Sequence, residues 1–318
     1  MKSARFQAMW WAAVAIAMTA CPVAIGADEA PQGAVNYGDE LPRIPQTAPA
    51  DAPATMIVRP GFAVDLAVAE PMLASPVAIA WDEDGRLFVA EMRGYSEDQG
   101  ERLGRIRLLH DDNADGTYDR ATVYADGLAW PTALVVFSGG LFVGDAPDIV
   151  WFKDTDGDGV ADEQKKIFSG FGTSNVQGLF NSFAFDVDGR IHGAGSSTGG
   201  EIRRVGDDGQ PVGDPVPING RDFSFDPRSY DFRAETGGAQ HGRSTDDLGH
   251  VYLCHNSDHA IRVMVDDRSL SRNPFFPAPA AKESIAVEGP QAAVYRSSPV
   301  EPWRVLRTRL RALSLIHI

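Results

Sequence analysis

Cysteine is nearly absent from this chain, and long apolar runs occur nowhere beyond its N-terminus. The 318 residues include two cysteines, Cys21 and Cys254. Cys21 lies in a segment that we expect to be removed or lipidated, so Cys254 has no partner and a structural disulfide is not expected. Cys254 follows an apolar, strand-like run and is expected to be a small buried residue. The sequence has no Cys-x-x-Cys-His motif, which excludes a covalently attached c-type haem in these residues.

Basic residues are scarce relative to acidic ones. The chain has 29 Lys and Arg against 44 Asp and Glu, which gives a formal net charge of -15. This charge opposes a nucleic-acid partner, because binding to a phosphate backbone requires a basic patch. The 32 glycines and 21 prolines, with 43% apolar residues, favour a turn-rich β protein with a large core.

The N-terminus has the pattern of an export signal. Two basic residues precede an apolar stretch from Ala8 to Ala20, which is too short to span a bilayer comfortably. We therefore predict a signal peptide over residues 1–27 and an exported, periplasmic or cell-envelope protein. Cleavage has two options: small residues at 24–26 suit an ordinary signal peptidase, and Met18-Thr19-Ala20-Cys21 resembles a lipobox that would anchor the chain through lipid on Cys21. The alternative is a retained anchor helix.

Composition divides the rest of the chain. Residues 28–60 are rich in Ala, Pro, Gln and Asp without an apolar period, and are predicted to form a flexible linker. Residues 61–311 are predicted to be the folded domain. Residues 312–318 resemble a non-native tail and are left out of the fold prediction.

The folded part contains a repeat of strand, tight turn and strand. Its four copies are 80–90, 136–144, 185–193 and 245–253. Four-stranded units that recur at roughly 40–50 residues, with extra length for loops, are typical of a β-propeller. We therefore predict an all-β propeller. Four blades are readable, and 303–307 is expected to open a fifth, so the ring is predicted to be incomplete.

Two nine-residue acidic loops share the pattern D-x-[DN]-x-D-G-x-x-D. Oxygen ligands at alternate positions can converge on one hard cation, and the glycine permits a sharp turn. The predicted calcium ligands are Asp111, Asn113, Asp115 and Asp119 in the first loop, and Asp154, Asp156, Asp158 and Asp162 in the second. Neither loop is an EF-hand, because Thr122 and Lys165 replace the bidentate Glu at position twelve. The alternative is an Asp-rich turn without metal.

Each loop is predicted to join the third and fourth strands of its blade. In the third blade, strand 201–205 is predicted to be the third strand, and the turn 206–209 is predicted to join it to the fourth. This turn is ordinary and lacks the ligand spacing.

Several segments together carry a family resemblance. They are Ala90-Glu91-Met92-Arg93-Gly94-Tyr95, the two acidic loops, Asn181-Ser182-Phe183 before 188–193, Cys254-His255-Asn256-Ser257-Asp258-His259, and 301–309. Over about Met56 to Arg311, the chain resembles the N-terminal propeller of membrane-bound dehydrogenases of planctomycete and verrucomicrobial type. These are similar to the soluble glucose/sorbosone dehydrogenases, which use pyrroloquinoline quinone (PQQ) and calcium. The resemblance implies a six-bladed, TolB-like or quinoprotein glucose dehydrogenase-like fold, of which four to five blades are present.

The same resemblance implies a sugar or alcohol substrate, with HEAT-like and c-type cytochrome domains in the full-length protein. In the sugar dehydrogenases a His before a blade turn acts as the base. The comparable residues 177–182 contain no His, and Gln and Asn cannot accept a proton at pH 7. The candidate catalytic residues are therefore His241, His255 and His259, and the candidate cofactor-binding residues are Arg93, Gln177 and Asn181. For the histidines, packing between blades is the alternative; for Arg93, it is a salt bridge to Glu91 or Asp98.

Three functions remain open. The first is a PQQ-dependent sugar or alcohol dehydrogenase fragment. The second is a non-catalytic propeller that binds glycans or partner domains at the cell envelope, which the missing His favours. The third is a calcium-dependent lactonase-like hydrolase, which the peripheral position predicted for the calcium loops disfavours.

Overall fold

The structure is a computed structural model that describes residues 36–43, 45–95, 99–273, 275–290 and 300–316. It divides into a large unit, Gln46–Tyr295, and a small unit formed by Met1–Pro45 with Arg296–Ile318. The predicted signal peptide lies outside the described residues. Within the described ranges, no helix is long and apolar enough to cross a membrane.

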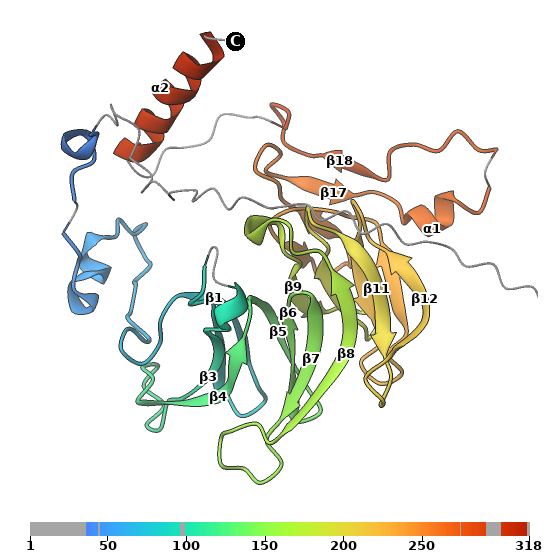
Figure 1. The fold of residues 1–318 in the computed structure, drawn as a ribbon, viewed down its shortest axis with the longest axis horizontal. Coiled ribbons are helices and arrows are strands. Elements are labelled where there is room, and N and C mark those ends of the chain that lie inside the picture. Colours follow the sequence, from blue (N-terminus) through green and yellow to red (C-terminus); the bar gives the residue numbers. More distant parts are fainter. Residues whose placement is uncertain (1–35, 44, 96–98, 274, 291–299, 317–318) are drawn as a thin grey trace, which may run out of the picture. The chain divides into compact units, whose positions relative to one another are not determined.

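The described part of the large unit contains four antiparallel sheets, which we call blades 1 to 4 (Figure 1). Blade 1 consists of β1 (Pro76–Trp81), β2 (Leu87–Glu91), β3 (Gly104–His110) and β4 (Arg120–Leu128). Blade 2 begins with β5 (Pro131–Phe137), β6 (Gly140–Asp145), β7 (Asp148–Lys153) and β8 (Glu163–Phe171). Blade 3 consists of β9 (Asn181–Phe185), β10 (Ile191–Ala194), β13 (Asp222–Phe225) and β14 (Phe232–Glu235). Blade 4 consists of β15 (Arg243–Thr245), β16 (Val251–Leu253), β17 (Ile261–Val263) and β18 (Lys282–Ser284).

The blades are arranged radially. The first strands contact one another in chain order: β1 contacts β5, β5 contacts β9, and β9 contacts β15. Each predicted repeat is the hairpin formed by the first two strands of a blade, and its acidic or glycine turn closes that hairpin. The fold is therefore an all-β propeller, and this prediction is confirmed.

One strand pair departs from the predicted order. β11 (Gly200–Val205) and β12 (Pro211–Pro217) were expected to be the third and fourth strands of blade 3. Instead β11 pairs with β8, so the hairpin extends blade 2 to six strands (Figure 1). The glycines Gly170 and Gly200 permit this pairing, because a Cβ on Gly170 would lie 2.2 Å from the Glu201 carbonyl oxygen and one on Gly200 would lie 2.4 Å from that of Gly170. The outer strands of blade 3 are β13 and β14.

The core lies between the blades. Phe88, Ile106 and Leu108 of blade 1 pack against Leu141 and Phe152 of blade 2. Between blades 2 and 3 the core is rich in phenylalanine; Phe171 stacks on Phe180 with a centroid separation of 3.9 Å. Such aromatic pairs stabilise a core beyond their buried area. The radial order of the blades is thus held mainly by apolar contacts between neighbouring sheets.

Antiparallel strand order places the connections alternately at two ends of the propeller. One end, which we call the mouth, carries residues 92–95 and 99–103 and the connections 129–130, 172–180, 236–242 and 254–260. The opposite end carries the two acidic loops and the hairpin turns of the repeats. The candidate catalytic and cofactor-binding residues therefore lie at the mouth, and the candidate calcium ligands lie at the opposite end.

Residues 303–307 do not open a fifth blade. They belong to helix α2 (Pro302–Ile316) of the small unit, so this prediction is wrong. Trp303, Leu306 and Leu310 recur at a helical spacing, and the arginines between them are good helix formers. In the same unit, Arg309 pairs with Glu40 of η1 (Gly38–Glu40) at 2.8 Å. The prediction of a non-native tail from residue 312 is not tested by this helix.

The described linker residues hold η1 and the two short 3-10 helices η2 (Pro49–Asp51) and η3 (Pro53–Thr55). The remaining short elements are η4 (Gln99–Glu101), η5 (Val176–Gly178) and α1 (Asp267–Leu270). The linker itself stays a prediction.

A buried carboxylate closes the mouth end of blade 3. Asp222 is fully buried on β13 and accepts hydrogen bonds from the N–H groups of Gly238 (2.8 Å) and Gly195 (3.2 Å). Its Oδ2 has no partner in the described structure, and a Cβ on Gly237 would lie 2.0 Å from it. Burial raises the pKa of Asp222 to about 6, although the two N–H groups act to lower it.

Replacing Asp222 by asparagine is expected to change the pH dependence of stability. The folded pKa of Asp222 is raised above its unfolded value, so its contribution is fully present below about pH 4 and is lost as the pH rises through about 6. The loss is on the order of 3 kcal/mol. The difference in unfolding free energy between Asp222→Asn and the wild type, measured by urea denaturation at pH 4 to 7, should shift in favour of the variant as the pH rises. A difference that stays constant over this range contradicts the prediction.

Candidate functional site

The two acidic loops share four hydrogen bonds between backbone N–H groups and side-chain oxygens. In both, the first Asp accepts from the sixth N–H: Gly116 donates to Asp111 and Gly159 to Asp154, each at 2.8 Å. The side chain of the third loop residue accepts from the backbone N–H of the fifth residue. In the same way, the fifth side chain accepts from the N–H of the seventh residue, and the ninth side chain accepts from the N–H of the second. The fourth and sixth residues of both loops have positive φ, at Ala114 and Gly116 in the first and at Gly157 and Gly159 in the second. The repeated sequence pattern thus gives a repeated loop conformation.

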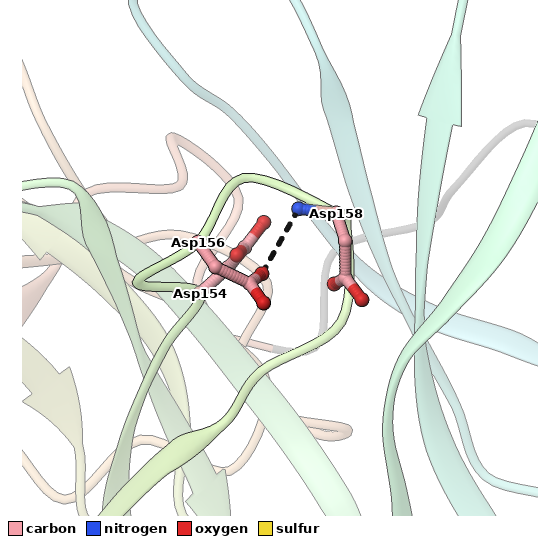
Figure 2. Close-up of side chains that lie close together, drawn as sticks. All are labelled: Asp154, Asp156 and Asp158. Atoms are coloured by element: carbon pink, nitrogen blue, oxygen red, sulfur yellow. Dashed lines mark hydrogen bonds between the residues drawn. The ribbon is translucent and has the colours of Figure 1, made fainter.

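The second loop gathers three carboxylates. Asp154, Asp156 and Asp158 each place a carboxylate oxygen within 4.8 Å of the other two (Figure 2). Asn113 stands in the first loop where Asp156 stands in the second. Burial acts to raise the pKa of Asp154, but the N–H groups of Gly159 and Gly157 outweigh it and hold that pKa below its usual value. Ionised carboxylates at this spacing are the ligands that a hard cation such as Ca²⁺ prefers.

Each loop also ties its blade to the preceding part of the chain. In the second loop, the Ala161 N–H donates to the Tyr124 carbonyl on β4 of blade 1 at 2.8 Å. In the first loop, the Tyr118 N–H donates to the Ala67 carbonyl at 2.9 Å. Burial raises the pKa of Tyr124 to about 12, so this tyrosine stays neutral beside the second loop. The loops are therefore joints between neighbouring elements as well as hairpin tips.

At the mouth, Asn181 clasps the connection between blades 3 and 4. Its Nδ2 donates to the carbonyls of Leu179 (3.0 Å) and Gln240 (3.2 Å). Its Oδ1 accepts from Ser182 Oγ (2.8 Å) and from the Gly242 N–H (3.1 Å). The amide thus uses its full hydrogen-bonding capacity within the protein. Asn181 holds residues 240–242 in place, and its expected cofactor-binding role stays a prediction.

These hydrogen bonds, which we call the Asn181 clasp, position His241 beside residues 177–182, the segment that contains no histidine. Asn181 binds the residues before and after His241, and Gln240 Nε2 also donates to the Gln177 carbonyl at 3.3 Å. His241 is exposed, and its Nε2 lies 2.8 Å from Asn256 Oδ1. Because an amide oxygen only accepts, His241 Nε2 is the donor in this contact, and in the neutral imidazole Nδ1 is then the nitrogen with a lone pair. The structure therefore brings His241, Gln177 and Asn181 together.

The other mouth candidates lie on neighbouring connections. Gln177 Nε2 donates to Tyr95 Oη at 2.9 Å, which joins the 172–180 connection to the one that carries Arg93. Arg93 is exposed; within the described residues Glu91 pairs with Arg105 and Arg107 instead of with Arg93. Its expected cofactor-binding role stays a prediction.

His255 and His259 share the connection 254–260. The Cys254 carbonyl accepts the His241 N–H at 3.1 Å, which places His255 next to the His241 backbone. The His255 N–H donates to the Asp258 carbonyl, and His259 is exposed at the far side of this turn. Among the described mouth residues, His241 is the histidine that hydrogen bonds join to Gln177 and Asn181, through its neighbours Gln240 and Gly242.

Three mouth residues were not singled out in the sequence: Tyr95, Gln240 and Asn256. Each stands within two residues of a candidate site residue, and this nearness was the sequence signal that could have found them. Their contacts could not be predicted, because they join connections that are far apart in sequence. Trp130 is buried and donates through Nε1 to the Gly94 carbonyl. His192 is buried, whereas Cys254, which was expected to be buried, is only half-buried.

The sequence of residues 48–314 matches the family described as Domain of unknown function (DUF7133). This chain belongs to the DUF7133 family. No curated protein matches it in sequence. The DUF7133 match covers the propeller and most of α2.

Similar solved structures are distant. They include the PQQ domain of pyranose dehydrogenase from Coprinopsis cinerea, in its holo form, at 13% identity and a TM-score of 0.38, over 60% of this chain and 44% of that one. A Trichoderma reesei carbohydrate-active enzyme of family AA12, in a calcium structure, has 14% identity and a TM-score of 0.33, over 61% and 47%. A Thermus thermophilus protein described as an oxidoreductase (glucose dehydrogenase) has 16% identity and a TM-score of 0.33, over 60% and 79%. The DUF7133 chain thus spans less than half of the length of the first two. At these values the similarity carries no argument about activity.

Proposed function

We propose that this protein is an exported, calcium-binding β-propeller of the PQQ-dependent sugar or alcohol dehydrogenase type. The proposal includes a periplasmic or cell-envelope location, through the predicted signal peptide or a lipid on Cys21. It also includes two further parts of the full-length protein that the sequence resemblance implies. One is a set of HEAT-like repeats, and the other is a c-type cytochrome domain that accepts the electrons.

The observation that supports the proposal is the position of His241. Residues 177–182 supply no base, but the Asn181 clasp holds His241 beside them, at the mouth. Asn256 Oδ1 accepts from His241 Nε2, which leaves Nδ1 as the acceptor in the neutral imidazole. A hydroxyl group bound at the mouth would then lose its proton to His241 Nδ1.

The residues at the mouth suit a quinone that bears carboxylates. Arg93 is an exposed guanidinium, which can bind a carboxylate through two parallel hydrogen bonds, and Tyr95 and Gln177 add polar groups from two further positions. Bound there, PQQ would accept the two electrons of the alcohol. His255 and His259, on the adjacent connection, are secondary candidates for contact with the substrate.

Calcium is proposed to serve the fold. The acidic loops lie at the end opposite the mouth, so their cations cannot take part in chemistry at His241. They would neutralise the clustered carboxylates and hold two joints between neighbouring elements. This arrangement disfavours the lactonase-like hydrolase, which needs its cation in the central channel.

A specific observation favours one other function, glycan or partner binding without catalysis. Both the Nδ2 and the Oδ1 of Asn181 form hydrogen bonds within the protein, and Gln177 Nε2 donates to Tyr95 Oη. A mouth whose amides are mutually satisfied is a rigid recognition surface, and it needs no base.

Titration of the purified protein with PQQ in the presence of Ca²⁺ tests the proposal. We expect a saturable absorbance change, and reduction of an artificial electron acceptor with an aldose or a primary alcohol. His241→Gln should lower kcat by about 100-fold, because the amide can keep the contact with Asn256 but cannot take a proton, and PQQ affinity should stay within about twofold. His250→Gln, a histidine at the opposite end, is the control and should have wild-type kinetics.

The absence of a saturable change with PQQ would contradict the proposal. Saturable binding of oligosaccharides without PQQ binding or dye reduction would instead establish the glycan-binding function.

A further inference from the structure

The chain that leads into blade 1 repeats, contact by contact, the chain that leads into blade 2. Pro76 opens β1 opposite Glu91, and Pro131 opens β5 opposite Asp145. Both pairings shift register at the next residue, which gives Ile79 and Leu134 equivalent positions. The two blades therefore start in the same way.

The buried carboxylates at these positions bind equivalent backbone groups. Glu91 Oε1 accepts the Ala74 N–H, from two residues before Pro76, at 2.7 Å. Asp145 Oδ2 accepts the Ala129 N–H, from two residues before Pro131, at 3.2 Å. Residues 74–75 thus stand in front of blade 1 as residues 129–130 stand in front of blade 2.

The acidic loops extend the correspondence further back along the chain. The eighth residue of each loop donates its N–H to the preceding element: Ala161 to Tyr124, and Tyr118 to Ala67. Tyr124 lies on β4, the outermost strand of blade 1. Ala67 therefore occupies, relative to blade 1, the place that an outermost strand occupies relative to blade 2.

The sequence around Ala67 is that of a strand, but it lacks a sheet. Phe62, Val64, Leu66 and Val68 alternate with small or acidic residues. In the described structure residues 63–69 belong to none of the four sheets, and Phe62, Val64 and Leu66 are exposed. Val68 alone reaches the apolar cluster of Leu73, Leu87, Val89 and Leu109 on the outer face of blade 1. Figure 1 shows this segment as the blue trace that leads into β1.

The face of blade 1 beside this segment is also uncovered. Ile79 is 51% exposed, whereas its equivalent Leu134 is 4% exposed because blade 1 packs over it. Val77 and Trp81, on the same face of β1, are exposed as well. A row of apolar side chains on the first strand of a propeller is the surface against which a neighbouring blade packs.

We propose that residues 62–69 are the outermost strand of a further blade, whose three inner strands come from a β-meander of the full-length polypeptide. This meander covers Val77, Ile79 and Trp81 and pairs with residues 62–69, so that the ring closes through strands from both ends of the propeller. Strand addition satisfies the backbone groups of residues 62–69 and the apolar face at the same time. The inference is independent of what the mouth binds.

Hydrogen exchange of the full-length product of the gene tests the proposal, with the 318-residue chain as comparison. Amides in residues 62–69 should exchange at least about 100-fold more slowly in the full-length protein than in the 318-residue chain. Equal, rapid exchange in both proteins would overturn the proposal, as would a gene that encodes no further residues. This comparison uses unmodified proteins, so it does not depend on the folding of a variant.

Substitutions give the second measurement. Leu66→Asp and Ile79→Asp should each lower the Tm of the full-length protein by about 5 °C or more, and leave the 318-residue chain within about 1 °C, because both side chains are exposed there. The control is Asp65→Asn, an exposed neighbour on the opposite face of the segment, which should change neither Tm. Equal effects of Leu66→Asp on both proteins would overturn the proposal. So would a dimer of the 318-residue chain that Leu66→Asp dissociates, because the occupant would then be a second copy.

Discussion

Chelation of calcium is expected to lower the melting temperature by about 10–20 °C. A cation present at about 100 times its Kd stabilises the folded state by about 2.7 kcal/mol per site, and two sites would add to about 5 kcal/mol. For a domain of this size, 1 kcal/mol corresponds to about 2–4 °C. The measurement is a thermal melt followed by circular dichroism, in excess CaCl₂ and in excess EDTA.

The physical reason lies in the repeated loop geometry. The two loops bring nine Asp or Asn side chains, eight of them candidate ligands, to hairpin tips, and three carboxylates of the second loop converge to within 4.8 Å. Without a cation these charges repel one another, which loosens the tips and, through Ala161 and Tyr118, the joints to Tyr124 and Ala67. Loss of the cation should therefore loosen contacts between elements as well as the loops.

Matched variants separate calcium binding from general electrostatics. The double variant Asp115→Ala with Asp156→Ala should melt at the same temperature with CaCl₂ and with EDTA. Asp208→Ala, in the acidic turn 206–209 that lacks the ligand spacing, should keep the full response. A wild-type melting curve that EDTA leaves unchanged would refute the calcium prediction.

Replacing Glu91 by alanine should destabilise the protein by about 3–5 kcal/mol. Glu91 is fully buried, accepts the Ala74 N–H, and pairs with Arg105 and, at 3.5 Å, with Arg107. Its removal would leave two guanidinium groups, each with only about 15% of its side chain exposed, without a buried counter-charge. It would also free the backbone in front of β1. The measurement is the unfolding free energy from guanidinium chloride denaturation.

Two further variants define the cause of that loss. Glu91→Gln keeps an acceptor for Ala74 but not the charge, so it should fall between the wild type and Glu91→Ala. Glu101→Ala, an exposed carboxylate on η4, should cost less than about 0.5 kcal/mol. If Glu91→Ala costs less than about 1 kcal/mol, the buried ion pairs do not hold blade 1 in the manner described.

The sequence predicted the parts of the fold that depend on local chemistry. Alternating apolar residues and acidic or glycine turns mark the first two strands of each blade, and both acidic loops join the third and fourth strands of blades 1 and 2. It failed where the choice is tertiary. A hairpin such as β11–β12 has the same local pattern whichever sheet edge it joins, and the apolar residues of 303–307 suit either a strand or a helix until the longer helical spacing is counted.

The candidate site shows the same division. The position and conformation of the two loops could be predicted, because each loop is contiguous in sequence; the eight calcium ligands stay a prediction, and three of them, in the second loop, lie close together. The mouth could not, because Asn181 and His241 are 60 positions apart, and their joining depends on how β9 meets the connection into β15. Buried Glu91 and Asp222 gave no signal, because a carboxylate beside an apolar strand is most often exposed.

The six-stranded sheet has a consequence for solubility. The nine-residue β8 would otherwise present a long row of unpaired amides to the solvent, where a second molecule could add a strand. Because the β11–β12 hairpin pairs with β8, the edge strand of the sheet is β12, which contains Pro211, Pro215 and Pro217. Proline has no N–H to donate, so this edge is a poor template for aggregation.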